Sequence, residues 1–500
     1  MRKQLGFGWA VLGLCLCLFG VTPSFAEPDA VAAVSGTSST APPSAASREI
    51  AERLAGAIRF ESVSYEAAED FDAAPFEALA AFLAEHYPRT HAELALTKVN
   101  AHSMLFEWKG SAPDLAPGLF MSHLDVVPVS ETALEGWDQP PFEGVIDDGF
   151  VWGRGAIDVK SGVILWLEAA EALLAEGFQP KRTLYLAFGH DEEIGGHNGA
   201  GAIAARLESE GVRLAFLFDE GGFLFDGHPL VPDRTVAQIV TAEKAYYTVV
   251  LTARGVSGHS SLPPRTTAIG KLSRAIAAVE ANPMPTRLIE PVREMLAAAQ
   301  PHVSGLDGFA LGNLWLTKGM VIKNLLKDDV SAAMVRTTFA ATLVSGGVKE
   351  NVIPESAQAT INVRILPGDT PEDVLAHLRK VIDDPEIEIE GTPWGPISKP
   401  GSSSGPAFQM AADAVRGVLP EAVVMPGLVP GATDTVHYMG ITDEVLRFVP
   451  LRVGIAQVGG AHGRNERIAV APLEQSRRIA TDLMRRAGAG LEGAAGTASE

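Results

Sequence analysis

Histidines and acids occur at five places in this sequence where a short apolar run ends or a glycine-rich turn begins. They are His123 and Asp125 in "MSHLDVVP", Asp158 in "GRGAIDVKSG", Glu192 and Glu193 in "GHDEEIGG", Asp219 in "LAFLFDEGG" and His462 in "GGAHGRNERI". One such residue alone is usually a cap or an ordinary loop residue. Histidines and acids at five such places together instead indicate a metal site, because imidazoles and carboxylates are the ligand types of zinc and related divalent metals.

The number of these residues is sufficient for two metals. Each ion could take one histidine and one terminal carboxylate, and a shared carboxylate could bridge the two ions. Two ions bridged in this way lie about 3.5–4 Å apart. A further carboxylate must then stay free as a general base, because the attacking water has to lose a proton. The adjacent Glu192 and Glu193 can supply one residue for each role.

Residues 47–242 alternate helical and strand patterns and would position these side chains. "GLFMSHLD", "TLYLAFGHD" and "LAFLFDE" predict short buried strands, and "KSGVILWLEAAEALLAEG" predicts a helix closed by Gly177. "SREIAERLAGAIRF" predicts another helix, with Ser47 as its cap. The pattern predicts an α/β fold with a mixed, mostly parallel sheet sandwiched by helices, whose sites form at the carboxyl edge of the sheet.

A different pattern begins near residue 243. Strand, helix, strand, strand, helix and strand follow one another through "EIEIEG", which is the order of a ferredoxin-like unit. A mostly helical stretch at 281–334 interrupts it, and the α/β pattern resumes near 395. We therefore predict a catalytic domain at 47–242 and 392–488, with a lid and dimerisation domain of α+β type inserted at 243–391.

The ends of the chain have other compositions. Arg2 and Lys3 precede an apolar run from Phe7 to Val21, which predicts a signal peptide of residues 1–26, with an uncleaved anchor helix as the alternative. Residues 27–46 and 489–500 read as a disordered linker and tail. We expect an exported protein, periplasmic or secreted, and its mature part would contain no cysteine.

The overall charge limits the partners. A formal net charge of −21, without a lysine- or arginine-rich block, argues against nucleic acid and against anionic membrane surfaces. No later stretch is long and apolar enough to span a bilayer. "GRGAIDVKSG" fits neither nucleotide-binding fingerprint, and "GHSSLPP" lacks the pattern around a nucleophilic serine.

The order of several motifs resembles one known family. "SHLDVVPV", "GRGAIDVKSG", "GHDEEIGG", "DEGG", "GVSGHSSLPP", "ENVIPESAQATINVR", "GATDTVHY" and "GAHGRNERI" are similar to the ArgE/DapE/aminoacylase/carboxypeptidase S family of two-metal exopeptidases and amidohydrolases. The likeness covers about residues 47–488 and is greatest to the carboxypeptidase S branch. That branch contains Gly-X carboxypeptidases and secreted enzymes that make or hydrolyse N-fatty-acyl amino acids.

The resemblance implies a role for each residue. His123 and Asp219 would bind one zinc ion, Glu193 and His462 the other, and Asp158 would bridge them, with Mn²⁺ or Co²⁺ as other metals. Asp125 would orient His123, Glu192 would move the proton, and His259 on the lid would stabilise the oxyanion. Asn351, Arg364, Thr433 and Asp434 would hold the substrate, with Arg364 as a fork for a free carboxylate.

The resemblance also implies a reaction and leaves alternatives. The first expectation is a carboxypeptidase or dipeptidase of the Gly-X type acting on small peptides. The second is an N-acyl amino acid amidohydrolase, and a binding protein on the same scaffold is a remote third. A homodimer through the inserted domain is left open. Val159 stands where the family usually has Asp, Asn or Gly, and in relatives the peptide before it is often cis.

Overall fold

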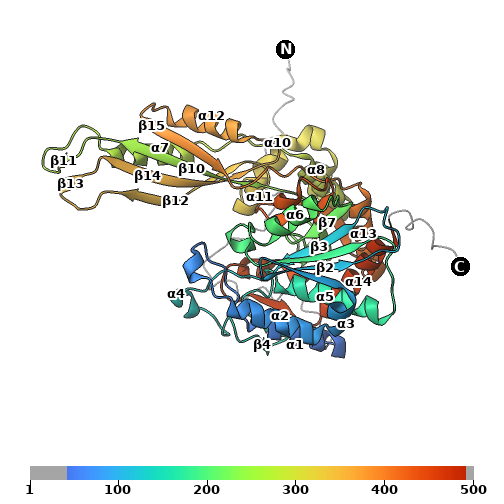
Figure 1. Cartoon of the computed structure of the whole chain (residues 1–500). Helices are drawn as coiled ribbons and strands as arrows, with labels where there is room; N and C mark the ends of the chain where they lie inside the picture. The colour runs from blue at the N-terminus through green and yellow to red at the C-terminus, as the bar shows by residue number, and fades with distance from the viewer. Residues whose placement is uncertain (1–41, 491–500) are drawn as a thin grey trace, which may run out of the picture.

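The computed structural model describes residues 42–490. The predicted signal peptide, residues 27–41 of the predicted linker and residues 491–500 of the predicted tail lie outside the described part. A broad α/β domain forms most of the molecule, and a narrower domain extends from one side of it (Figure 1). None of the helices in residues 42–490 is long and apolar enough to cross a membrane.

A ten-stranded mixed sheet forms the centre of the large domain. Its main order is β1-β2-β6-β3-β7-β17-β9-β8-β18, with β16 beside β9. Parallel pairs hold β3 to β6 and β7, and antiparallel pairs join β1, β2 and β6. The strands are β1 Ala95–Val99, β2 Ser103–Trp108, β3 Gly118–His123, β6 Leu184–Gly189, β7 Phe216–Asp219, β8 Leu224–Asp226, β9 Val236–Glu243, β16 Val423–Val429, β17 Val445–Arg447 and β18 Arg452–Gly454.

Helices cover both faces of this sheet. Successive side chains along a strand point to opposite faces, and both faces carry buried apolar side chains. On β3, Phe120 joins the core under α1, α5, α13 and α14, whereas Leu119 and Met121 join the core under α6. The predicted sandwich is therefore present. The helices of this domain are α1 Ala45–Ile58, α2 Ala74–His86, α3 Pro88–Glu93, α4 Glu131–Leu134, α5 Lys160–Ala175, α6 Ala200–Ser209, α13 Pro406–Val418 and α14 Leu473–Ala489.

Two helix ends test the sequence patterns. Gly177 has φ +72° and its N–H donates to the Leu174 carbonyl, which ends α5 as predicted. The expected cap of α1 was wrong. Ser44, not Ser47, is the N-cap, because the Ser44 hydroxyl accepts from Ser47 N–H and the helix starts three residues earlier than predicted.

The inserted domain has the expected β-α-β-β-α-β order. Its antiparallel sheet is β12-β14-β10-β15, and α7 and α12 pack on one face of it. The ribbon β11-β13 lies at the far tip of the domain (Figure 1). The elements are β10 Ala245–Arg254, β11 Gly258–His259, α7 Ala268–Ala281, β12 Thr338–Gly346, β13 Val352–Ile353, β14 Ser356–Ile365, α12 Pro371–Ile382 and β15 Ile387–Pro393.

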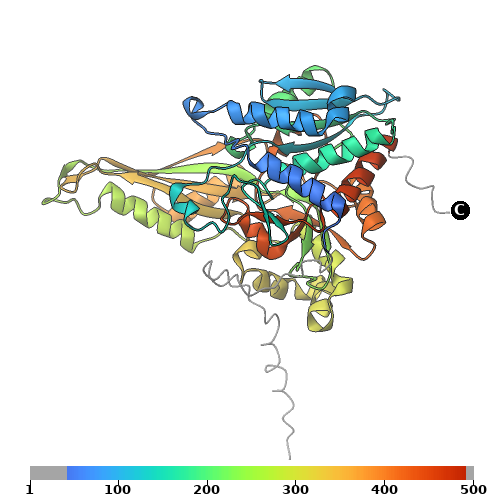
Figure 2. The ribbon, with the colours of Figure 1, turned by 90° about the horizontal axis from the view of Figure 1, so that it is seen from below.

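A group of four helices interrupts this order between α7 and β12, as the sequence predicts. We call it the helical insertion: α8 Glu290–Ala299, α9 Gly305–Gly312, α10 Leu314–Leu325 and α11 Asp329–Ala333. Its buried side chains share a core with β9 and β16 of the large domain. Figure 2 shows these helices beside the large sheet, apart from the tip of the inserted domain.

Short elements complete the loops around the site. A three-stranded sheet contains β19, β5 and β4. The bounds are β4 Val145–Asp147, β5 Phe150–Trp152, β19 Arg467–Ala469, η2 Ala68–Asp70, η3 Glu192–Ile194, η4 Gln300–His302, η5 Asp434–Tyr438 and η6 Ile455–Gly460.

Candidate metal centre

Three neighbouring strands bring acids and a histidine to one edge of the large sheet. β3 ends at His123, which is in register with Gly189 at the end of β6, and β7 ends at Asp219. Because β6, β3 and β7 are parallel, their carboxyl ends lie side by side. The turn η3, with Glu192 and Glu193, follows β6 at this edge.

Asp158 lies between the two predicted histidine ligands. Its Oδ1 is 3.2 Å from His123 Nε2 and its Oδ2 is 3.0 Å from His462 Nε2. Each oxygen of one carboxylate therefore faces a different imidazole, as a bridging ligand requires. The peptide bond between Asp158 and Val159 is cis.

Glu193 completes one half of the centre. Its Oε2 lies 3.0 Å from His462 Nε2, and one oxygen or nitrogen atom from each of Asp158, Glu193 and His462 falls within a 4.8 Å cluster. Glu193 Oε1 is buried and has no hydrogen-bond partner in the described part of the chain. A free carboxylate oxygen beside two other ligand atoms suits a metal ion.

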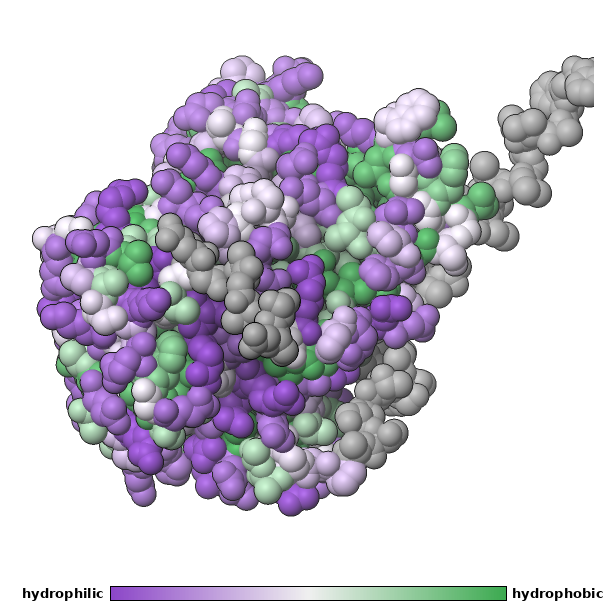
Figure 3. Space-filling view, turned by 90° about the vertical axis from the view of Figure 1, so that its right-hand side faces the viewer, coloured by the Kyte–Doolittle hydropathy of each residue, from purple (hydrophilic) through white to green (hydrophobic). Residues whose placement is uncertain are grey.

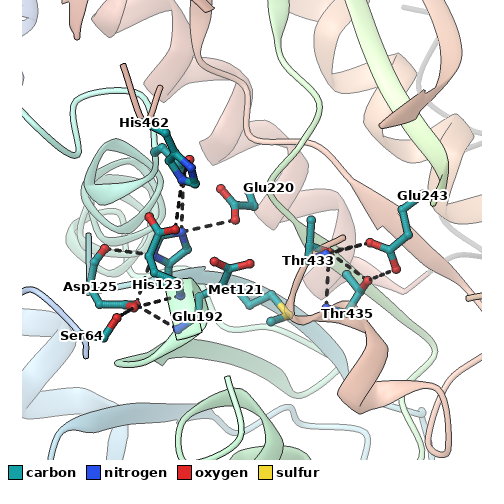
Figure 4. A network of polar contacts seen from close by, with 12 residues as sticks. Ser64, Met121, His123, Asp125, Glu192, Glu220, Glu243, Thr433, Thr435 and His462 are labelled. Carbon is teal, nitrogen blue, oxygen red and sulfur yellow. Dashed lines mark hydrogen bonds and ion pairs between the residues drawn. The ribbon is translucent and has the colours of Figure 1, made fainter. Parts of the chain in front are cut away.

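In the other half, Glu220 lies beside His123. Glu220 Oε1 lies 3.3 Å from His123 Nε2, and these two residues cluster with Asp158 (Figure 4). Asp219 is buried, its Oδ2 has no hydrogen-bond partner among residues 42–490, and it belongs to none of the metal-like clusters found there. The ligand role of Asp219 stays a prediction, and the geometry adds Glu220 as a candidate for the same role.

The crowding of acids shifts their pKa values. Burial raises the pKa of Glu220 to about 8, with the charge of Asp158 adding to it, and burial also raises that of Glu193. Burial raises the pKa of Glu192 well above the usual range, and the charges of Glu220 and Asp434 act in the same direction. Because these carboxyl groups are buried close together, their ionised forms need nearby cations for stabilisation.

The pKa values of the two histidines are also raised, which favours the protonated and charged form of each imidazole. Burial opposes the protonated form of His123, but the charge of Glu220 and a hydrogen bond donated to Asp125 outweigh it and raise its pKa. Hydrogen bonds to Asp158 and Glu193 raise the pKa of His462 to about 10. Protons on these imidazoles thus balance charge that two divalent metals would balance when bound.

Asp125 links His123 to the turn that carries the two glutamates. Its Oδ1 is 3.3 Å from His123 Nδ1, and its two oxygens accept from the N–H groups of Glu192 and Glu193 at 3.1 and 3.0 Å. The Ser64 hydroxyl donates to Asp125 Oδ2 at 2.5 Å (Figure 4). Asp125 therefore lies against both His123 and the backbone of Glu192, and its role of orienting His123 stays a prediction.

Asp191 and Gly196 shape the same turn. Asp191 accepts from the N–H groups of Asn198 and Gly199 at 2.8 and 2.7 Å, so the acid supports the loop and is not aimed at the metals. Gly196 has φ +63°, and a Cβ there would lie 1.8 Å from Asp434 Oδ1. Only glycine fits between the turn and Asp434.

Sequence reasoning missed a carboxylate that holds the Asp158 loop. Glu466, four residues after His462, is fully buried and accepts from the N–H groups of Gly155, Ile157 and Asp158 at 3.1, 2.7 and 3.0 Å. Arg154 Nη1 donates to it at 2.7 Å. The only sequence signal for Glu466 was its position in the motif that contains His462. Its role could not be read from that motif, because its contacts are with residues about 310 positions away in the sequence.

A second buried network holds the loop of Thr433 and Asp434. Glu243 accepts from the N–H and hydroxyl of Thr433 at 3.0 and 3.1 Å and from the Thr435 hydroxyl at 2.9 Å (Figure 4). Arg447 Nε donates to Glu243 at 3.0 Å, and both side chains are fully buried. The hydroxyl of Thr433 is thus engaged inside the protein, and Asp434 is the member of the pair that lies against the catalytic turn.

Lys244, the next residue, holds the inserted domain. Its Nζ donates to the carbonyls of Ala333 and Arg336 at 3.2 and 3.0 Å and to the Thr338 hydroxyl at 2.9 Å. Glu243 and Lys244 are both fully buried and point into different domains. The peptide bond between them, where β9 ends and β10 is about to begin, is one of the connections from the catalytic domain to the lid.

Arg364 forms part of an aromatic wall beside the catalytic turn. Its guanidinium lies 4.3 Å from the Tyr246 ring centre, and Tyr246 lies 5.7 Å from Trp394. Trp394 is packed so close to Gly195 that a Cβ there would lie 3.0 Å from the indole. Burial lowers the pKa of Arg364, while the charges of Tyr246 and Glu192 oppose that shift. Arg364 therefore lies within electrostatic reach of Glu192.

His259 and Asn351 lie elsewhere. Both are exposed, and His259 belongs to β11 at the tip of the inserted domain, far from the end of β3 (Figures 1 and 2). Ser260 N–H donates to the Asn351 carbonyl at 3.2 Å, so the two residues share this tip. The structure brings His123, Asp158, Glu192, Glu193 and His462 together and leaves His259 and Asn351 outside that group.

The chemistry of the donors fits two divalent ions of the zinc type. Imidazole nitrogens and carboxylate oxygens converge in two overlapping clusters that share Asp158. The buried, unpartnered Glu193 Oε1 is a ligand atom without another use in the described residues. Such a site, with a neighbouring glutamate, defines a metal-dependent hydrolase.

Comparison with known proteins gives the same class. The model of peptidase family M20/M25/M40 matches residues 119–486. The chain is 38% identical over 428 residues to the N-fatty-acyl-amino acid synthase/hydrolase PM20D1 of Mus musculus, covering 84% of each protein. It is 32% identical over 475 residues to carboxypeptidase S of Saccharomyces cerevisiae, covering 84% of this chain and 81% of the yeast protein.

Solved structures share the fold. An M20 family metallo-carboxypeptidase, Sso-CP2 from Sulfolobus solfataricus, superposes with a TM-score of 0.65 at 19% identity, covering 88% of this chain and 99% of its own. The chain belongs to peptidase family M20/M25/M40. It is a metal-dependent hydrolase of the branch that contains the PM20D1 and carboxypeptidase S-like proteins, as the sequence motifs predicted.

Proposed function

We propose that the chain hydrolyses an amide bond between an acyl group and an amino acid with a free carboxylate. The observation that carries this proposal is the bridging position of Asp158 between His123 and His462, with Glu192 beside them and Arg364 nearby. Water activation needs the first group, and recognition of a carboxylate needs the arginine.

Each residue has a part in this reaction. His123, Asp158, Glu193 and His462, with Asp219 or Glu220, would hold two Zn²⁺ ions, and Mn²⁺ or Co²⁺ suits the same donors. When bound, the metals would supply Lewis-acid activation of water and of the scissile carbonyl. Glu192 accepts the proton of the attacking water and transfers it to the leaving amine, and its raised pKa suits that exchange.

Arg364 and the wall beside it would orient the substrate. The guanidinium is the cation suited to grip a free carboxylate in two hydrogen bonds. Tyr246 holds it in place by lying under it, and Asp434 borders the turn that carries Glu192. A substrate without the carboxylate would lose this contact, which favours terminal amino acids over internal peptide bonds.

For the acyl group, we place N-acyl amino acids, including long-chain fatty acyl ones, first. The support is the 38% identity to a protein named as an N-fatty-acyl-amino acid synthase/hydrolase. A carboxypeptidase of the Gly-X type, which the sequence motifs favoured, is the second candidate, supported by the relatives named carboxypeptidase S or carboxypeptidase S-like. We also propose export after cleavage of residues 1–26.

A homodimer would give His259 and Asn351 a role. Within residues 42–490, the outer edge of β12 pairs with no strand, and most of its residues are exposed. A partner strand there would extend both sheets. We propose that the exposed tip with His259 and Asn351 serves the site of the partner subunit, where the imidazole would stabilise the oxyanion.

The test offers purified enzyme a blocked Gly-X dipeptide and a long-chain acyl derivative of the same amino acid. Free amino acid is measured, and the carboxamide forms of both substrates are the controls. We expect hydrolysis of the acids and at least tenfold lower kcat/KM for the carboxamides. Equal rates for acids and carboxamides would exclude the proposed carboxylate recognition.

Metal removal and a lid variant test the remaining parts. Chelation should abolish turnover, and added Zn²⁺ should restore it; full activity in metal-free protein would exclude the two-metal centre. His259→Ala should reduce kcat while leaving metal content unchanged. A wild-type rate for His259→Ala would remove the lid histidine from the reaction.

A further inference from the structure

His462 is the most exposed of the residues proposed to hold the metals. Its side chain is 55% exposed, whereas those of His123, Glu193 and Asp158 are 1%, 5% and 21% exposed. Within residues 42–490, the contacts of its imidazole all use Nε2, which faces Asp158 and Glu193. Packing therefore does little to fix the direction of this ring.

His123 has a second contact that fixes its ring. Its Nδ1 donates to the Asp125 carbonyl at 3.0 Å, which leaves Nε2 to face the metals (Figure 4). A hydrogen bond on the second nitrogen commonly fixes the orientation of a metal-bound imidazole. His462 makes no such contact within the described part of the chain, so the direction of its ring must follow from its backbone.

The backbone of the loop from His462 to Asn465 is unusual. His462 has φ +56° and Asn465 has φ +58°, a left-handed conformation that residues other than glycine adopt mainly where neighbouring contacts hold them. One such contact comes from inside the protein, because the buried Arg154 donates from Nη2 to the Gly463 carbonyl at 2.9 Å. This contact holds the first half of the loop.

Asp138 and Asn465 hold the second half of the loop from outside. Asp138 N–H donates to Asn465 Oδ1 at 2.7 Å, and Asn465 Nδ2 donates to Asp138 Oδ2 at 3.0 Å. We call these two hydrogen bonds the 138–465 clamp. Beside them, Arg464 lies so close to Gly136 that a Cβ on Gly136 would be 2.3 Å from Arg464 Nη1. The segment before β4 is thus packed directly against the His462 loop.

An exposed polar contact does not by itself indicate a role. Hydrophilic side chains predominate on the face shown in Figure 3, so contacts between surface polar groups are common on this protein. The 138–465 clamp differs because it holds the loop of a proposed metal ligand whose ring has no second partner within residues 42–490.

We propose that Asp138 and Asn465 position His462 and thereby set how tightly the Glu193 half of the centre holds its metal. The inference rests on the proposed ligand role of His462. While the clamp is closed, the loop keeps the imidazole directed at Glu193. When the clamp is broken, the exposed ring is free to turn toward water. The Glu193 half then offers one ligand fewer, while the half with His123 is unchanged.

A cycle of substitutions separates the hydrogen bonds of the clamp from its charge. Asn465→Asp removes the donor and places a second carboxylate against Asp138. Asp138→Asn removes the charge but keeps an acceptor oxygen, and so keeps both hydrogen bonds. The double variant Asp138→Asn with Asn465→Asp reverses the pair and has the net charge of wild type. Asparagine and aspartate both tolerate the left-handed backbone at position 465.

The Zn²⁺ affinity of each half is measured by competition with a coloured chelator. Loss of a partner that orients a metal ligand typically lowers affinity about 10–100-fold. Because the clamp is exposed, we expect Asn465→Asp to weaken one site about tenfold and to leave the other unchanged. The added negative charge would by itself strengthen the binding of a cation, so it does not explain weaker binding. Asp138→Asn and the double variant should bind as wild type.

Gln139→Glu is the matched control. Gln139 Nε2 donates to Asp147 Oδ2 at 3.0 Å, which is another exposed contact between an amide and a carboxylate, but it does not involve the His462 loop. The substitution makes the same chemical change beside the clamp and should leave both affinities unchanged. Urea unfolding of the metal-free proteins verifies that the variants fold with similar stability.

His462→Ala separates failure of this inference from failure of the metal centre. If His462→Ala binds two Zn²⁺ as tightly as wild type, His462 is not a ligand, and the proposed centre and its clamp both fail. If His462→Ala loses one Zn²⁺ while Asn465→Asp binds as wild type, the centre stands and the positioning role is excluded. Equal weakening of both sites by Asn465→Asp, or no recovery in the double variant, would also overturn the positioning role.

Discussion

The buried pair of Glu243 and Arg447 offers the sharpest test of how the substrate loop is held. In the Glu243→Gln variant the side chain keeps its shape but loses its charge and one acceptor oxygen. Glu243 accepts from Thr433, Thr435 and Arg447, and all of these side chains are buried. The variant would leave the Arg447 cation uncompensated and turn an amide N–H₂ toward other donors.

The size of the effect follows from the burial of both partners. Removing one member of a buried ion pair costs about 3–5 kcal/mol, because the remaining charge stays out of water without a partner. Glu243 and Arg447 are both fully buried, so solvent screening does not reduce that range. We expect Glu243→Gln to lower the free energy of unfolding by about 3–5 kcal/mol.

Urea unfolding followed by circular dichroism measures this change. The control is Glu176→Gln, which breaks the exposed pair with Arg485 and should leave the unfolding midpoint unchanged. The double variant Glu243→Gln with Arg447→Met removes both charges and should recover much of the lost stability. It should still show a lower kcat/KM than wild type, because the Thr433 loop has lost its anchor.

Two outcomes would refute this reasoning. If Glu243→Gln unfolds at the wild-type midpoint, the pair does not hold the loop. If the double variant is less stable than the single one, the loss does not come from an uncompensated Arg447.

Three further predictions concern the reaction and its pH range. Glu192→Gln should keep both metals and lose about 10²–10⁴ in kcat, whereas Glu193→Gln should lose metal by elemental analysis; equal metal loss in both variants would contradict the division of roles. Arg364→Met should raise KM for the free acid about 10–100-fold with little change in kcat, and a selective loss of kcat would instead place Arg364 in the chemical step. Burial lowers the pKa of His228 to about 4, so between pH 6.5 and 4 the unfolded chain binds the proton first and the fold loses about 3 kcal/mol as the pH falls. His228→Asn should remove that loss from the difference between urea unfolding at pH 7 and at pH 4.5, and an unchanged difference would show that His228 is not responsible.

Much of the centre was predictable because its residues are tied to strand ends. His123 ends β3, and the turn with Glu193 follows β6, so parallel pairing alone brings them together. The contact between Glu220 and His123 was less accessible to sequence reasoning. Consecutive residues at a strand end point to opposite faces, and which one meets His123 depends on where the strand stops.

The supporting residues required information that lies outside local patterns. Glu466 joins the Asp158 loop across about 310 positions, and Glu243 joins Thr433 across 190. Hydrophobic periodicity predicts where elements begin and end, but it does not show which buried acid meets which N–H group. The position of the lid tip was equally hidden, since "GVSGHSSLPP" predicts a loop without indicating how far the β10 and β14 strands carry it from the metals.

The adjacent residues Glu243 and Lys244 bear on protein engineering. Glu243 contacts the catalytic domain through Thr433 and Arg447, and Lys244 contacts the inserted domain through the carbonyls of Ala333 and Arg336. A chimera that exchanges inserted domains between relatives would therefore need its junction at the peptide bond between these two residues. With a junction one residue earlier, position 243 would carry the side chain of the donor protein. That side chain would then stand in place of Glu243 in the contacts that hold the Thr433 loop of the recipient.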